Sequence, residues 1–560
     1  MAPLVGITLV IGNMPSSTSS DMEKPNVQHQ ENTTADDGVH ELSADERLLH
    51  SLGYKQDLNR GLSRFSNMAI AFSCCSILSG LTPMWGTAIY QAGSMSVIWG
   101  WFVTTFFTII VAMSLAEICS AYPTTGGLYF WVSRLATAEW VPLACWVTGW
   151  ANWMGLAFAI TSVDLGLSQF LGSIINIWRP DVNTSVYMEY GIFVGIIIIH
   201  GIINSVAVKW NGIMNQLSFW FNMLGILLIV IVGLALTPNK ASGSWVFTSE
   251  SFANNSGFAS NGYAFLLVIL QSQYTLSGYD SAAHMSEETK NSQTGSPFGM
   301  LFSVIANGVS GFIFLIAVSF MVQDFNAQVV NASILPEMAQ VFYDGVGPAW
   351  TMVFLLFVLG SIFFSGSALT LGSSRMVYAF ARDGAMPFSK KLHSLNKRTQ
   401  SPVWAVWFNI VVAGLLGILF MVNSTAYTAI VSVNTIGSQL SYLFPILIRI
   451  TASRKTFARG PWHLGKFSVP LGWISCCWLT FTCALFICPT EAPITAENMN
   501  YAILPFVVIM GASVGYYYLF ARKWFTGPVR VVDGEQVVLG EDDEEPVNEP
   551  VNIEKTEQAI

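Results

Sequence analysis

The chain has 560 residues, of which 52% are hydrophobic and only 11% charged, and its mean hydropathy is +0.51. Because soluble globular proteins carry about 25% charged residues, this composition excludes an ordinary soluble domain. The net charge of −9 offers no basis for binding nucleic acid, and the eight cysteines show no Cys-x-x-Cys spacing, so we expect neither a metal site nor a cofactor.

In chain order, residues 1–47 are polar and acidic, which predicts a disordered cytoplasmic tail. Long apolar runs follow, each within a segment of about 20 residues, enough to cross a hydrocarbon core of roughly 30 Å. An acidic cytoplasmic tail is expected over residues 524–560. Between the tails, residues 48–523 predict twelve transmembrane helices, centred near residues 77, 106, 152, 196, 224, 273, 310, 360, 411, 437, 480 and 511.

Basic residues test this helix count, because cytoplasmic loops hold most Lys and Arg. If both termini are cytoplasmic, all of the 25 basic residues except Arg179 and Lys240 fall in inner loops or tails. An odd number of helices would scatter these charges over both faces. The sequence therefore predicts an all-α integral membrane protein with both ends inside, in the plasma membrane or in an organelle membrane.

The first and sixth predicted helices share an irregularity. The first contains Ser79-Gly80 followed by Thr82-Pro83, and the sixth contains Ser277-Gly278. Five helices separate one copy from the next, so the second copy enters from the opposite face. This predicts two inverted five-helix repeats and two extra helices near the C-terminus, over residues 60–238, 260–452 and 470–522.

An interrupted helix at membrane depth is tolerated where its freed backbone groups face a cavity or packed protein. Matching interruptions in two repeats are typical of a transporter's binding site, although small residues in membrane helices also serve close packing. We expect the outer half of the first helix to begin near Thr82-Pro83, with free N–H groups around Ser79, Gly80 and Leu81 that hold a carboxylate. Exposed carbonyls near Ser76, Ile77, Tyr274 and Thr275 would hold an ammonium. The predicted partner is therefore a small zwitterion, an amino acid or γ-aminobutyrate.

Asp280 follows Gly278 within the sixth helix. An acid at mid-depth costs roughly 2.5–3.5 kcal/mol on insertion scales, so it needs water, a partner or a proton. One interpretation gives Asp280 a role in handling substrate or protons; the other has it cap the following helix. His284 and the acids Glu287 and Glu288 are interpreted as cytoplasmic gate or surface residues.

Three segments carry a resemblance to a known family: "AEICSAYPTTGGLYFWVSRL", "GYDSAAHMSEETKNSQTGSP" and "SSRMVYAFARDGAMPFS". In this order they resemble the amino acid/polyamine/organocation superfamily, and most closely its amino acid/choline transporters, near plant bidirectional amino acid transporters and fungal γ-aminobutyrate permeases. The resemblance implies a LeuT-like fold that works by alternating access. It also implies a carboxylate clamp at residues 79–81, an aromatic gate at Tyr274 and an acid at Asp280. Tyr279 is not a fixed feature of the wider superfamily; it is a candidate pocket contact, and both tyrosines could instead be core aromatics.

The coupling ion is predicted from side chains that could carry it. Proton coupling needs a titratable group near the path, and Glu117, Asp164, His200 and Asp280 are candidates. Asp164 and His200 could instead satisfy only one another. Hydroxyls at Ser365 and Ser367 could assist sodium or simply pack. The interpretation favours proton coupling or exchange over sodium.

These observations favour a secondary permease for amino acids or γ-aminobutyrate in a lipid bilayer. A choline or polyamine permease is the alternative cargo, although choline favours an aromatic cage and a polyamine several acids. A substrate-sensing receptor is the alternative of another class. An enzyme is not expected, because no matched Ser/His/Asp set or His-rich helix is present.

Overall fold

The computed structural model describes residues 43–179, 181–182, 184–206, 208–422, 426–496, 498–528, 530–532 and 535–537, which belong to one compact unit. The predicted N-terminal tail lies outside the described residues up to Leu42, and the predicted C-terminal tail lies outside them beyond Val537. Helix α1 begins at Ala44, where Ser43 forms a capping box with Glu46.

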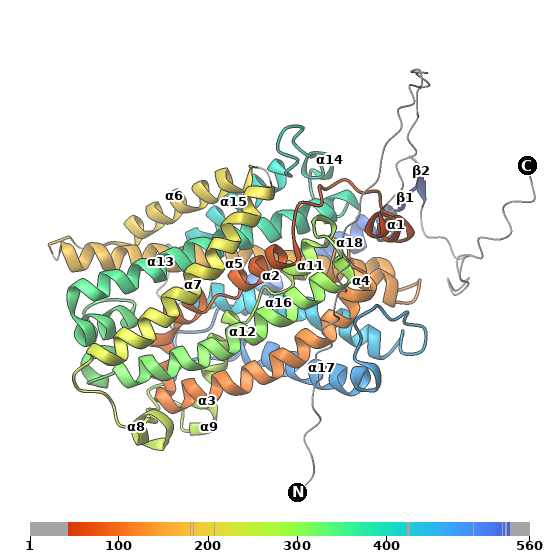
Figure 1. Cartoon of the computed structure of the whole chain (residues 1–560). Helices are drawn as coiled ribbons and strands as arrows, with labels where there is room; N and C mark the ends of the chain where they lie inside the picture. The colour runs from red at the N-terminus through yellow and green to blue at the C-terminus, as the bar shows by residue number, and fades with distance from the viewer. Residues whose placement is uncertain are drawn as a thin grey trace, which may run out of the picture. The chain divides into compact units, whose positions relative to one another are not determined.

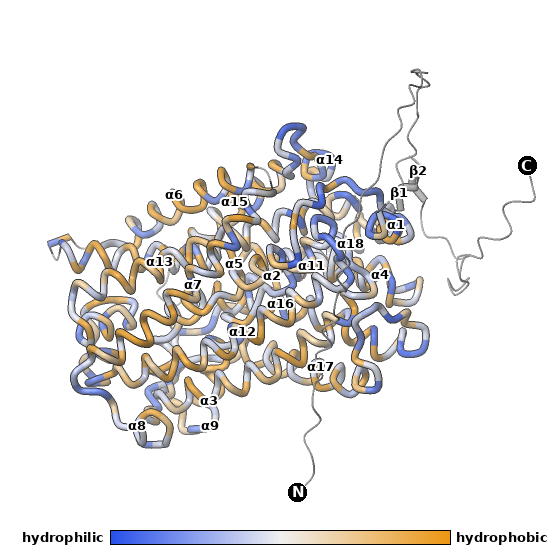
Figure 2. The backbone as a smooth tube through the Cα atoms, viewed as in Figure 1, coloured by the Kyte–Doolittle hydropathy of each residue, from blue (hydrophilic) through white to orange (hydrophobic). Residues whose placement is uncertain are grey.

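Ten stretches of the described residues are long and apolar enough to cross a membrane. Polar residues gather at the ends of these helices and in the connecting segments (Figure 2). The ten stretches are built on α3 (Ile77–Ala121), α5 (Val141–Trp178), α6 (Val186–Asn204), α7 (Val208–Leu236), α12 (Ser292–Met321), α13 (Glu337–Arg382), α15 (Val403–Gly417), α16 (Ala426–Ile450), α17 (Ser468–Leu485) and α18 (Ile503–Leu519).

Two places explain why ten stretches are found where twelve helices were predicted. The first stretch runs over 58 residues, from α2 (Arg64–Cys74) through α3, and Gly93 inside α3 has a non-helical φ of 75°. A Cβ on Gly93 would lie 1.8 Å from the Ser251 carbonyl oxygen, so this bend requires glycine. The second place is residues 261–284, where helices too short to count individually replace one long helix.

The remaining elements are short and connect or flank the long helices (Figure 1). An antiparallel pair of strands follows the last helix, so the all-α prediction holds for the membrane part. These elements are α4 (Leu128–Leu135), α8 (Gly243–Phe247), α9 (Asn261–Leu267), α10 (Ile269–Thr275), α11 (Ser281–His284), α14 (Ser389–Leu392), the 3₁₀ turns η1 (Ser249–Ser251), η2 (Ser286–Glu288), η4 (Ile418–Met421), η5 (Gly465–Phe467) and η6 (Ala521–Lys523), the π turn η3 (Asn326–Val330), and strands β1 (Arg530–Val532) and β2 (Glu535–Val537).

Burial distinguishes central helices from peripheral ones. In the most apolar part of α5, 78% of the residues are buried within the protein, against 17% in the stretch that contains α18. Helix α5 packs against α13 and α16, while α3 packs against α10 and α12. The short helices α10 and α11 thus lie among long helices on several sides, where an interrupted backbone is shielded from lipid.

Candidate functional site

The first interruption lies between α2 and α3. Helix α2 ends at Cys74, and Ser76 has an extended ψ of 134° while its carbonyl accepts the Gly80 N–H at 3.0 Å. The prediction that the outer helix starts near Thr82-Pro83 is therefore wrong by a few residues. The helix already begins at Ile77, and because Pro83 removes only one N–H, it continues through the proline. The free first-turn N–H groups are those of residues 77–79.

The second interruption lies between α10 and α11. Helix α10 ends at Thr275, and residues 276–280 separate it from α11, which begins at Ser281. Gly278 has a φ of 88°, a conformation that residues with a Cβ rarely adopt. This confirms the predicted break at Ser277-Gly278.

The two interrupted helices touch at Gly80. A Cβ on Gly80 would lie 2.6 Å from the Thr275 Oγ1 and 2.7 Å from the Thr275 Cα. Gly80 therefore lies in the first turn after the break and also forms a close packing contact with α10. The absence of a side chain there allows the first turn of α3 to approach the last turn of α10.

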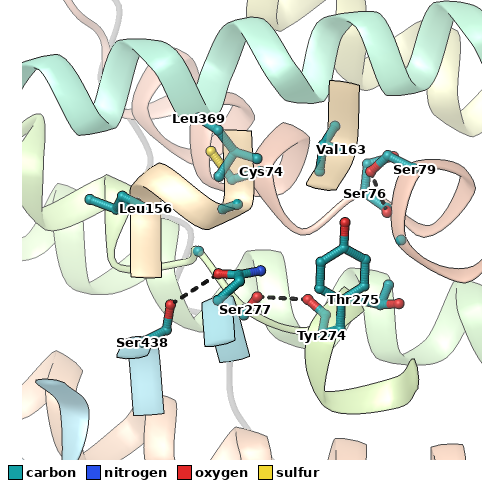
Figure 3. A pocket seen from close by; sticks show the side chains of 14 residues that line it. Cys74, Ser76, Ser79, Leu156, Val163, Tyr274, Thr275, Ser277, Leu369 and Ser438 are labelled. Atoms are coloured by element: carbon teal, nitrogen blue, oxygen red, sulfur yellow. Dashed lines mark hydrogen bonds between the residues drawn. The ribbon is translucent and has the colours of Figure 1, made fainter. Parts of the chain in front are cut away.

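A small cavity of about 20 Å³ lies between the interruptions (Figure 3). This volume suits about one water, so the helices are closed around the site and must separate to admit a larger molecule. Residues of both breaks, of α5, α13 and α16 line it: Cys74, Ser76, Ser79, Gly80, Leu156, Ala159, Val163, Tyr274, Thr275, Ser277, Gly278, Leu369, Asn434 and Ser438.

Six of the ten predicted binding residues line the cavity: Ser76, Ser79, Gly80, Tyr274, Thr275 and Gly278. The other four do not line it in this conformation. Ile77 and Leu81 are buried in α3, and the Leu81 carbonyl accepts a hydrogen bond from Gln271 at 3.3 Å. The Tyr279 ring packs against the Tyr442 ring at a tilt of 43°, with ring centroids 5.2 Å apart.

Tyr274 stands inside the cavity, between Ser277 on one side and Ser76 and Ser79 on the other (Figure 3). Its hydroxyl donates to the Ser162 Oγ of α5 at 3.1 Å. The ring is 4% exposed, so this bond joins α10 to α5 across the site. Rotation of one side chain would break it.

Asp280 does not cap α11, so the capping interpretation is wrong. Its Oδ1 accepts the Tyr442 hydroxyl at 2.7 Å, and its Oδ2 accepts the Asn152 amide at 2.9 Å. The His284 Nε2 lies 3.4 Å from the same Oδ2. The carboxylate turns toward α5 and α16 because these helices supply two donors that the first turn of α11 would otherwise provide.

The interpretation of His284, Glu287 and Glu288 as surface residues is also wrong, because all three are fully buried. Glu287 pairs with Arg382 at 3.4 Å, and Glu288 pairs with Arg375 at 2.9 Å. Arg375 and Arg382 lie seven residues apart in the largely apolar segment 373–389. Because a buried arginine requires an acidic partner, these two residues were the sequence signal that could have indicated buried acids.

The coupling candidates lie away from the cavity. Asp164 and His200 pair with each other, with 3.1 Å between Oδ2 and Nδ1. Glu117 accepts the Leu464 N–H at 3.1 Å and lies 3.9 Å from Arg449. The remaining two are on α13: Ser367 accepts from Asn204 at 3.3 Å, and the buried Ser365 hydroxyl has no hydrogen-bond partner among the described residues.

One polar cluster at the first interruption was not predicted. The Ser76 hydroxyl lies 2.6 Å from the Asn222 Oδ1 of α7 and 2.7 Å from the Ser361 hydroxyl of α13. Ser361 also donates to Asn222 at 2.5 Å. All three side chains are at most 1% exposed. The break between α2 and α3 is therefore held by two helices distant in sequence.

The N-terminal segment, residues 43–62, packs over the C-terminal end of α13 and over η2. The Tyr54 ring packs on Arg382 at 3.8 Å, and its hydroxyl donates to the Asp383 carboxylate at 3.3 Å. Tyr129 donates to the same carboxylate at 2.8 Å. Burial, with a smaller contribution from Asp383, raises the pKa of Tyr54 well above its usual 10.0, so the phenol stays protonated at physiological pH.

Tyr54→Phe is expected to loosen this packing while keeping the ring on Arg382. The loss is about 1.5 kcal/mol of stability, the low end for hydrogen bonds to charged groups, because Tyr129 still donates to Asp383. Thermal unfolding in detergent measures it. The control is Tyr187→Phe on α6, whose ring is 74% exposed and whose variant should unfold like the wild type. Equal unfolding of all three proteins would contradict a role for the Tyr54 hydroxyl.

An all-α membrane protein with a small polar cavity between two interrupted helices has the architecture of a membrane permease. A family model described as amino acid permease matches residues 62–512. The chain belongs to this amino acid permease family, whose members named below are permeases rather than enzymes.

Individual relatives agree with this assignment. The chain is 37% identical to amino-acid permease BAT1 of Arabidopsis thaliana over 86% of this chain and 95% of that protein. It is 36% identical to the BAT1 homolog of Oryza sativa, with 87% and 96% covered. It is 29% identical to the GABA-specific permease of Saccharomyces cerevisiae, with 86% of each chain covered.

Proposed function

We propose that this protein carries a zwitterionic amino acid or γ-aminobutyrate across the membrane by alternating access. The observation that supports this most directly is the cavity between the two interruptions. The N-terminus of α3 directs free N–H groups toward it, and the C-terminal ends of α2 and α10 bring carbonyl groups. Such a site offers both poles to a carboxylate and an ammonium.

The cavity lining favours a zwitterion over the alternative cargoes. None of the residues lining it is charged, in the part of the chain that the structure describes. A polyamine would require acids there, and Asp280 is already bonded to Asn152 and Tyr442. Choline would require several aromatic faces, whereas Tyr274 is the single aromatic residue among those lining the cavity.

The proposal includes twelve crossings in two inverted repeats. Dividing α3 at Gly93 and treating α9–α11 as one interrupted crossing raises the ten stretches to twelve. Both repeats then contain a broken first helix, and both termini are cytoplasmic, which places the basic loops inside. The plasma membrane is the expected location.

Transport is proposed to use protons or exchange rather than sodium. The relatives named GABA-specific and amino-acid permease support the cargo, while the titratable Asp280 and His284 beside the second break support proton use. A substrate-sensing receptor built on this fold would bind the same ligand without moving it.

Uptake and counterflow in proteoliposomes test the proposal. Labelled α-amino acids, γ-aminobutyrate, choline and spermidine would be offered under a proton gradient, a sodium gradient and neither. We expect counterflow of amino acids or γ-aminobutyrate and accumulation only with the proton gradient. Movement of choline or spermidine alone would contradict the zwitterion site, and binding without counterflow would indicate a receptor.

A further inference from the structure

Two buried Asp–His pairs occur in the described membrane helices, and they differ in the protons that they need. In the first, the His200 Nδ1 lies 3.1 Å from the Asp164 Oδ2. In the second, the His284 Nε2 lies 3.4 Å from the Asp280 Oδ2. All four side chains are at most 1% exposed, so bulk solvent does not reach them.

The Asp164–His200 pair is satisfied by a neutral histidine. A neutral imidazole carries one N–H, and the Nδ1–H of His200 can donate to the carboxylate. The His200 Nε2 forms no ion pair with a second acid among the described residues, so the contact between this histidine and its carboxylate needs no second proton.

The Asp280–His284 pair cannot be satisfied in the same way. The His284 Nδ1 lies 3.0 Å from the Thr125 carbonyl oxygen, which can only accept, so Nδ1 must carry the hydrogen. A neutral His284 would then leave a bare lone pair on Nε2, which lies 3.4 Å from the Asp280 Oδ2 and has no hydrogen-bond partner among the described residues. Two facing acceptors in a dry site are unfavourable, and one extra proton between them removes the conflict.

We propose that Asp280 and His284 together hold the transported proton, an inference that rests on the proposed transport function. The proton binds between Nε2 and Oδ2 as an imidazolium–carboxylate pair without net charge. It leaves to cytoplasmic water when the inner side opens. No bond other than N–H or O–H is made or broken.

Within the described ranges, no positively charged side chain beside the pair balances the negative charge of Asp280, so the bound proton balances it. Asn152 of α5 and Tyr442 of α16 donate to the carboxylate, and neither carries a positive charge. The other titratable neighbours of Asp280 are Tyr279, Cys74 and Cys75, which add no positive charge either. Among the described residues, no Lys or Arg forms an ion pair with Asp280, while the nearby acids Glu287 and Glu288 are paired with Arg382 and Arg375.

A short chain of contacts links the pair to the substrate cavity. The Tyr442 hydroxyl donates to Asp280 and accepts the Gly278 N–H at 3.3 Å, and Gly278 lines the cavity. On the other side, His284 contacts the loop after α3, where a Cβ on Gly127 would lie 3.1 Å from its Cε1. After loss of the proton, His284 has one N–H for two acceptors, the Thr125 carbonyl and the Asp280 carboxylate, so one of these two contacts weakens.

The experiment compares accumulation with counterflow in proteoliposomes of the full chain, using the amino acid that gives the highest wild-type counterflow. For one proton per substrate, a gradient of one pH unit should drive about tenfold accumulation by the wild type. His284→Gln can still donate to Asp280 but cannot titrate, so it is expected to retain counterflow and to lose accumulation. Asp280→Asn is expected to lose accumulation as well, and its counterflow should also fall, because its amide would face the Asn152 amide that donates to Oδ2.

His200→Gln is the matched control, because its pair needs no extra proton, and it should accumulate substrate like the wild type. Wild-type accumulation by His284→Gln or Asp280→Asn would overturn the proton site while leaving the transport function intact. If neither variant shows counterflow, a pH-sensitive dye inside wild-type vesicles decides: substrate-dependent proton entry supports the site, and its absence overturns it. Absence of wild-type counterflow would contradict the transport function itself.

Discussion

Gly80→Leu is expected to abolish uptake while leaving the protein inserted and folded. The leucine Cβ would lie 2.7 Å from the Thr275 Cα, so a backbone atom, not a flexible side chain, must move. Forcing extra volume into a packed contact costs roughly 1–3 kcal/mol. Here the strain separates α3 from α10 at the cavity, which removes the geometry that the first-turn N–H groups require.

Labelled substrate uptake and size-exclusion chromatography of the detergent-solubilised protein measure the two effects separately. Gly80→Ala should show a smaller loss, because the same Cβ contact arises without the larger side chain. Gly195→Leu on α6 is the matched control, since nothing lies within 4 Å of a Cβ at that position. Near-normal uptake by Gly80→Leu, with Gly195→Leu also active, would count against the site.

Arg375→Met is expected to cause the largest loss of stability. The Arg375–Glu288 pair has a distance of 2.9 Å, and both side chains are fully buried. Removing one partner from a buried pair leaves an uncompensated charge and costs roughly 3–5 kcal/mol. The variant should unfold at a markedly lower temperature, or yield little folded protein, in a thermal-shift or chromatographic assay.

The double variant Arg375→Met/Glu288→Met separates charge from packing. Because the desolvated acid is gone, it should recover much of the lost stability. The control is Arg179→Met, which breaks an ion pair whose side chains are 67% and 64% exposed, and it should unfold like the wild type. A double variant less stable than Arg375→Met would show that the pair stabilises the fold in its own right.

The two helix interruptions show how far local sequence could locate the site. The break at Gly278 was predicted correctly. The backbone there has a φ of 88°, a conformation that favours glycine, so the break leaves a residue that can be recognised in the sequence. The break before α3 was placed too late, since Gly80 and Pro83 suggested it but both lie within the helix. Gly80 serves close approach to Thr275, a contact between segments that sequence spacing does not reveal.

The ionisable residues show a different limit. Asp164 and His200 were open to two interpretations, and the structure places them against each other. Asp280 was expected either to handle substrate or protons or to cap the following helix. The structure instead bonds it to Tyr442, which lies 162 residues away in the chain. Glu287 and Glu288 were interpreted as cytoplasmic gate or surface residues, and the structure contradicts the surface alternative. Nothing in the neighbouring sequence indicates that arginines about ninety residues later pair with them.

By itself, the sequence determined that the chain is a bundle of membrane helices and that two of the helices are interrupted, one of them at Gly278. These properties depend on apolar content and on the backbone preferences of a few neighbouring residues, so they do not require knowledge of the fold. Only the tertiary structure decided where the first break begins, which donors Asp280 meets and which six predicted residues line the cavity. A buried polar group must find its partners wherever helix packing brings them, and Asn152, 128 residues from Asp280, is such a partner.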